Sequence, residues 1–102
     1  MKTKLDEASE VIYEVVEQMV DLFIKRMAAV SMVAEYKAEN SMPIFDNGRE
    51  DVIKHKNMEM LANKKLESYY KTFFDGVLKA SKDYQNDIIN KYKENNKWKI
   101  MH

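Results

Sequence analysis

Residues 5–40 read LDEASEVIYEVVEQMVDLFIKRMAAVSMVAEYKAEN and contain neither glycine nor proline. Apolar residues recur along this stretch at steps of three and four, which is the period of an amphipathic α-helix. The apolar seam consists of Leu5, Ala8, Ile12, Val15, Met19, Leu22, Ala29, Val33 and Tyr36. The pattern predicts a single long helix.

The length of this helix also predicts an assembly. Thirty-six helical residues would span about 54 Å at a rise of 1.5 Å per residue. A compact domain of this chain length is only roughly 30 Å across. One chain cannot cover such a helix along its whole apolar seam, so we expect an intertwined homodimer.

The remaining chain supplies two further helices. Pro43 ends the first helix, because proline disfavours helical geometry in the residue before it, and a short loop follows. Asp46 or Asn47 can cap a second helix that reaches Leu61, and a polar break at 62–64 precedes a third helix over about 65–93. We predict one all-α domain over residues 1–102, with helices in the order long, short, long and a flexible tail at 95–102.

Composition excludes several classes of function. Lys and Arg number 17 and balance the 17 Asp and Glu, so no net charge favours nucleic acid or an anionic membrane. The chain has no cysteine, and its two histidines, His55 and His102, are too few for a usual zinc site. It has no run of about 18 apolar residues and no apolar signal core near Met1. We expect a cytoplasmic protein that uses no metal or cofactor and does not bind membranes.

Two cations interrupt the apolar face of the long helix. Arg26 falls on the seam, and Lys37 follows eleven residues later, about three turns on, so both point in nearly the same direction. Cations on a largely apolar face are costly unless an anion joins them. The alternative is that each side chain reaches a glutamate or extends to solvent.

The other two helices carry similar interruptions. Ser81 and Gln85 occupy seam positions of the third helix, where they form either part of a ligand site or a small buried hydrogen-bond network. Arg49 and Glu50 open the second helix, as ligand groups or as a solvated first turn. With 15 lysines and only two arginines, the arginines suggest bidentate carboxylate recognition. Together these residues fit a small ligand with more than one carboxylate and a hydroxyl.

The order and spacing of these residues resemble the all-helical chorismate mutase family. The resemblance rests on Arg26-Met27, Lys37, the segment Pro43 to Glu50, and Ser81-Lys82-Asp83-Tyr84-Gln85, and it covers roughly residues 5–89. It implies an intertwined dimer and an isomerase that rearranges chorismate to prephenate in phenylalanine and tyrosine biosynthesis, without a cofactor.

The resemblance also implies a role for each residue. Arg26, Lys37 and Gln85 are the expected catalytic residues: Arg26 would hold the side-chain carboxylate, and Lys37 and Gln85 would contact the ether oxygen. Arg49 and Ser81 would bind the ring carboxylate, and Glu50, helped by the backbone near Asp46, would accept the ring hydroxyl. The expected apolar walls are Val33, Ile53 and Leu78.

One position departs from the family. The family usually carries an arginine 17 residues before the one matched by Arg26, and this arginine reaches across the dimer into the other subunit's site. Here the position is Ser9. Three alternatives to an active mutase therefore stay open: a catalytically weak or inactive relative, an isochorismate pyruvate-lyase, and a purely structural helical dimer.

Overall fold

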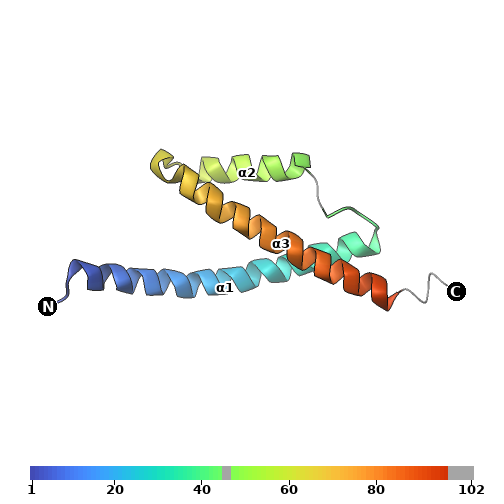
Figure 1. The fold of residues 1–102 in the computed structure, drawn as a ribbon, viewed down its shortest axis with the longest axis horizontal. Helices are drawn as coiled ribbons and strands as arrows, with labels where there is room; N and C mark the ends of the chain where they lie inside the picture. The colour runs from blue at the N-terminus through green and yellow to red at the C-terminus, as the bar shows by residue number, and fades with distance from the viewer. Residues whose placement is uncertain (45–46, 97–102) are drawn as a thin grey trace.

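The computed structural model describes residues 1–44 and 47–96, with Asn47 described by its backbone alone. It contains α1 (Lys4–Glu39), α2 (Asn47–Leu61), a 3₁₀ turn η1 (Lys64–Leu66) and α3 (Glu67–Asn95). Figure 1 shows α3 crossing the second half of α1, with α2 beside the first half of α3. The described residues form no strand, so the predicted all-α class and the order long, short, long are confirmed.

The ends of α1 follow from local chemistry. Thr3 caps the first turn: its hydroxyl accepts from the Asp6 amide at 3.1 Å, and its own amide donates to the Asp6 carboxylate at 3.0 Å. These two bonds lower the pKa of Asp6. At the other end Ser41 takes a left-handed backbone with φ 53°, and Pro43 follows. The predicted helix over 5–40 is confirmed to within one residue at each end.

The predicted break between the second and third helices is also present. α2 ends at Leu61 as expected, and Ala62 has a left-handed φ of 48°. The Asn63 side chain accepts from the Lys65 amide at 3.1 Å and so caps the η1 turn, which delays the start of α3 to Glu67. The third helix therefore begins and ends two residues later than predicted.

Two other sequence predictions concern residues at the edge of the description. Asp46 lies outside the described residues, and so does the side chain of Asn47. The expected tail begins at 95, whereas Asn95 is the last residue of α3 and the Asn96 amide donates to the Tyr92 carbonyl at 3.1 Å. Residues 97–102 lie outside the described part.

The buried face of α1 differs from the predicted seam in its second half. The buried residues are Ala34, at 0% exposure, with Ser81 and Ile89 of α3. Ala34 lies about 100° around the helix from the seam residue Val33, which is 40% exposed. The seam residues predicted in this half do not pack on α3, because α3 covers the neighbouring face.

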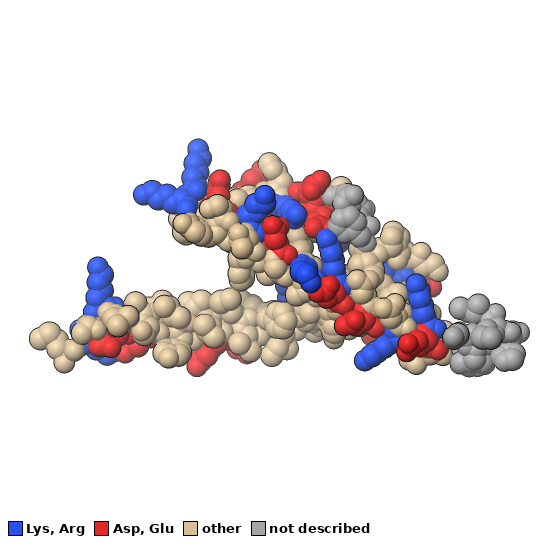
Figure 2. Space-filling model, in the orientation of Figure 1, with Lys and Arg blue, Asp and Glu red and all other residues tan. Residues whose placement is uncertain are grey.

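The first half of α1 extends away from the other helices (Figure 1). The chain measures 72 × 30 × 15 Å, and its radius of gyration is 18.7 Å, against about 13 Å for a compact domain of a hundred residues. Figure 2 shows this part of α1 with few charged side chains on the face drawn, while charged side chains crowd α2 and α3. The exposed apolar residues here are Leu5, Val11, Ile12, Val15, Val16, Met19, Val20, Leu22, Phe23 and Ile24.

The length of α1 alone would suffice to span a bilayer, which needs about 20 residues. Acidic residues nevertheless recur along it, at Glu10, Glu14, Glu17 and Asp21. Within the described ranges, no helix combines the length and the apolar character that crossing a membrane requires.

Candidate functional site

A cavity of about 380 Å³ lies where the second half of α1 meets α2, α3 and the loop that follows α1. Each of these elements contributes polar or apolar residues to its wall. The lining residues are Arg26, Ala29, Val30, Val33, Lys37, Met42, Pro43, Ile44, Arg49, Glu50, Ile53, Leu78, Ser81, Lys82 and Gln85.

Arg26 is anchored to α3 by a neutral partner. Its guanidinium donates to the hydroxyl of Ser81, which in turn donates to the Val77 carbonyl at 2.9 Å. Arg26 is half-buried and, among residues 1–44 and 47–96, forms no ion pair with an acidic side chain. A half-buried guanidinium held by a hydroxyl retains its full charge for an anionic ligand.

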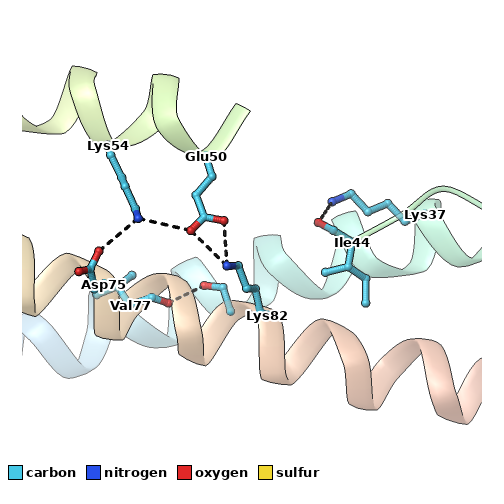
Figure 3. Close-up of polar contacts among 8 residues, drawn as sticks. Lys37, Ile44, Glu50, Lys54, Asp75, Val77 and Lys82 are labelled. Carbon is cyan, nitrogen blue, oxygen red and sulfur yellow. Dashed lines mark hydrogen bonds and ion pairs between the residues drawn. The ribbon is translucent and has the colours of Figure 1, made fainter. Parts of the chain in front are cut away.

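Lys37 joins the loop to α3 at the other end of the cavity. Its ammonium donates to the Ile44 carbonyl at 3.1 Å (Figure 3) and lies 3.5 Å from the Gln85 side-chain oxygen. Both acceptors are neutral oxygens. Because the Gln85 oxygen faces Lys37, its amide nitrogen is the group that can donate to a ligand.

Glu50 forms the acidic part of the site. Its carboxylate faces the Lys82 ammonium at 2.8 and 3.1 Å and the Lys54 ammonium at 3.6 Å, and Lys54 also lies 3.5 Å from Asp75. Figure 3 shows these side chains bridging α2 and α3. The Glu50 side chain is only 16% exposed, so its charge is held mostly away from bulk water.

The structure brings together most of the site residues predicted from the sequence. Six of them line the one cavity: Arg26, Lys37, Arg49, Glu50, Ser81 and Gln85. The predicted walls Val33, Ile53 and Leu78 line it too. Asp46 lies outside the described residues. The roles of these residues toward a substrate stay predictions.

The geometry bears on the alternatives left open for two of these residues. The small hydrogen-bond network considered for Ser81 is present, because its hydroxyl links Arg26 to Val77. To donate to a ligand, this hydroxyl would have to release the Val77 carbonyl. Arg49, by contrast, is exposed at the rim and contributes its charge there.

Two lysines of the site were missed by sequence reasoning. Lys82 follows Ser81 in the chain and reads as a solvated neighbour, yet it lines the cavity. Lys54 lies one turn after Glu50, and this spacing of four residues could have identified it as a partner of the carboxylate. The fact that both meet at Glu50 depends on how α3 packs on α2, which periodicity does not reveal.

A second hollow of similar volume lies at the turn between α2 and α3. Its titratable members His55 and Glu59 pair with each other at 3.2 Å, and their side chains are 79% and 69% exposed. Charges this open to water are strongly screened. The hollow therefore concentrates no field on a ligand, and the candidate site is the cavity around Arg26 and Lys37.

The lining of that cavity defines the ligand it can bind. Arg26, Lys37, Arg49 and Lys82 carry positive charge against the single carboxylate of Glu50, which favours a small anion with more than one negative group. Gln85 and Ser81 add neutral polar groups, and Val33, Ile53 and Leu78 add apolar surface. This arrangement can bind, orient and stabilise charge.

Comparison with known proteins agrees with this description. The family model for chorismate mutase type II matches residues 10–86, a range that includes all the lining residues of the cavity. Neither a curated protein nor a solved structure matches the chain. With three quarters of its length matched and an anion-binding cavity within the matched range, the chain belongs to the chorismate mutase type II family.

Proposed function

We propose that this protein is a chorismate mutase, which rearranges chorismate to prephenate and acts as a cytoplasmic homodimer in phenylalanine and tyrosine biosynthesis. Family membership supports the choice of substrate. The observation that carries the proposal is the meeting of Arg26, Lys37 and Glu50 at one cavity, from sequence positions on two different helices.

The charges of the cavity fit chorismate. This substrate carries two carboxylates, and Arg26 lies deep in the site while Arg49 lies at its rim. Binding one carboxylate at each arginine would fold the flexible side chain over the ring, so that less entropy is lost at the barrier. Glu50 would accept a hydrogen bond from the ring hydroxyl.

Lys37 and Gln85 would supply the rate enhancement. As the bond between carbon and the ether oxygen stretches, negative charge grows on that oxygen. Donors that strengthen their bonds as this charge develops stabilise the transition state more than the ground state. The Lys37 ammonium and the Gln85 amide lie next to each other at one end of the cavity, 3.5 Å apart through the amide oxygen. The reaction is a one-substrate rearrangement, so these groups need not transfer a proton.

A second copy of the chain is part of the proposal. The exposed apolar residues of α1 between Leu5 and Ile24 would bury most of their area against a partner. Within the described residues of one chain, only Ala34 and Ile89 are buried apolar residues, which is too small a core to stabilise a domain of this length. Sedimentation at micromolar concentration should give twice the chain mass; a folded monomer would contradict this part.

One assay tests the activity. Purified protein is mixed with chorismate, the ultraviolet absorbance of the substrate is followed, and the product is identified. Prephenate is the expected product. A parallel reaction with isochorismate tests the nearest enzyme alternative, since release of pyruvate from isochorismate without conversion of chorismate would identify a pyruvate-lyase instead.

Ser9 favours a second candidate, a weak or inactive member of the family. Residue 9 lies on the first half of α1, remote from the cavity of its own chain (Figure 1), so any contribution from this position would reach the partner's site. Serine cannot supply the cation that the family usually places there. Chorismate binding without turnover would support this candidate over the mutase.

A further inference from the structure

The cation next to the acidic group of the cavity is the feature that the proposed mechanism does not use. The Lys82 ammonium meets both oxygens of Glu50, at 3.1 and 2.8 Å. It lines the same cavity as Arg26 and Lys37, and its side chain is 35% exposed. In Figure 3 it reaches from α3 toward Glu50 on α2.

This arrangement compensates the charge of Glu50 before any ligand arrives. Lys54 adds a second ammonium, 3.6 Å from one Glu50 oxygen. The carboxylate still has lone pairs for another donor, because two oxygens offer about four acceptor positions. A neutral hydroxyl can use one of them without changing the local charge.

A cationic donor would face a different energy. A ligand ammonium at Glu50 would lie within a few ångströms of the Lys82 and Lys54 ammoniums, and it would share one negative charge with both. Like charges at this separation repel strongly where water is partly excluded. The 16% exposure of Glu50 indicates such a setting.

We propose that Lys82, supported by Lys54, is a specificity-determining residue: it makes the Glu50 end of the cavity select a substrate with a neutral hydroxyl over one with an ammonium at that position. This inference rests on the proposed function, because it takes the ring hydroxyl of chorismate as the group that meets Glu50.

A merely structural role for Lys82 makes a different prediction. The pair ties α2 to α3, and its loss could lower stability or the active fraction of the protein. Such a loss would reduce activity toward every substrate by the same factor. The ratio of kcat/KM for two substrates, measured on one preparation, cancels that factor and reports selectivity alone.

The test compares chorismate with its analogue in which an amine, protonated at neutral pH, replaces the ring hydroxyl. Wild-type protein should prefer chorismate, and Lys82→Met should reduce this preference about tenfold or more. Lys82→Arg keeps the charge and should retain the preference. Lys79→Met is the matched control, since Lys79 is on the same helix but pairs with Asp83 on the exposed side, at 2.8 Å.

Each result decides between the possibilities. An unchanged ratio in Lys82→Met, or a wild-type protein that prefers the amine, would overturn this inference and leave the proposed function standing. Conversion of neither compound by the wild-type protein would overturn the proposed function and this role with it. If Lys82→Met fails to fold, Lys54→Met should move the ratio in the same direction by a smaller factor, and an unchanged ratio there counts against the inference.

Discussion

Replacing Lys37 by methionine removes an ammonium and keeps most of the aliphatic stem. In the free protein this ammonium donates to the Ile44 carbonyl at 3.1 Å and lies 3.5 Å from the Gln85 oxygen. A hydrogen bond from a charged group contributes about 1.5–3 kcal/mol when well buried. Lys37 is only half-buried, so solvent screening reduces the expected loss of stability to about 1 kcal/mol.

The expected loss of turnover is much larger. Deleting one donor to an oxygen that gains negative charge in the transition state costs about 2.7–4 kcal/mol, or about 100- to 1000-fold in kcat. KM should change far less, because Arg26 and Arg49 would still hold the two carboxylates. The difference between a small loss of stability and a large loss of kcat distinguishes a catalytic role from a structural one.

The assay measures kcat and KM with chorismate, together with thermal unfolding followed by circular dichroism. A loss of about 1 kcal/mol should lower the melting temperature by roughly 4–8 °C for a domain of this length. Lys79→Met, on an exposed lysine, is the control and should leave kcat unchanged. A Lys37→Met protein with kcat within tenfold of wild type would refute the reasoning.

Four further predictions follow from other residues. Gln85→Glu should be active only at low pH, where the new carboxyl is protonated and can donate; a flat pH profile of kcat would contradict the role of Gln85. Ser9→Arg should raise kcat/KM if the partner's site lacks a cation, whereas an unchanged rate would show that the site is complete without one. Leu22→Lys should shift the sedimenting species toward the single-chain mass with loss of helix content, because the exposed apolar seam of α1 would then carry a charge; an unaltered dimer would place the interface elsewhere. The backbone and then the side-chain hydrogen bonds of Thr3 lower the pKa of Asp6, so this carboxylate stabilises the start of α1 above its unfolded pKa of about 3.9, and the contribution is lost as the pH falls through the lower folded value; Asp6→Asn should reduce this acid-dependent loss, measured by amide exchange near residue 6, and an identical pH dependence would refute it.

Several features of this protein were determined by the sequence alone, since they depend on local rules. The absence of glycine and proline between Leu5 and Asn40, followed by Pro43, determines a long helix and its end, because helix propensity and the restriction before proline act within a few residues. The same length predicts a helix that outgrows its own chain, and the 72 Å extent agrees. Polar residues such as Arg26 and Gln85 on apolar seams identify a site because such placement is costly without a partner.

The tertiary structure decided which faces meet and therefore which charges meet. Periodicity placed Val33 on the packed seam, but α3 covers the face that contains Ala34, since the crossing of two helices selects one of several possible registers. The same crossing, with the packing of α2 on α3, brings Lys82 and Lys54 to Glu50. These residues are up to 32 positions apart in the chain, and no local rule relates them. The cavity, its excess of positive charge and the compensation of its one carboxylate are thus properties of helix packing.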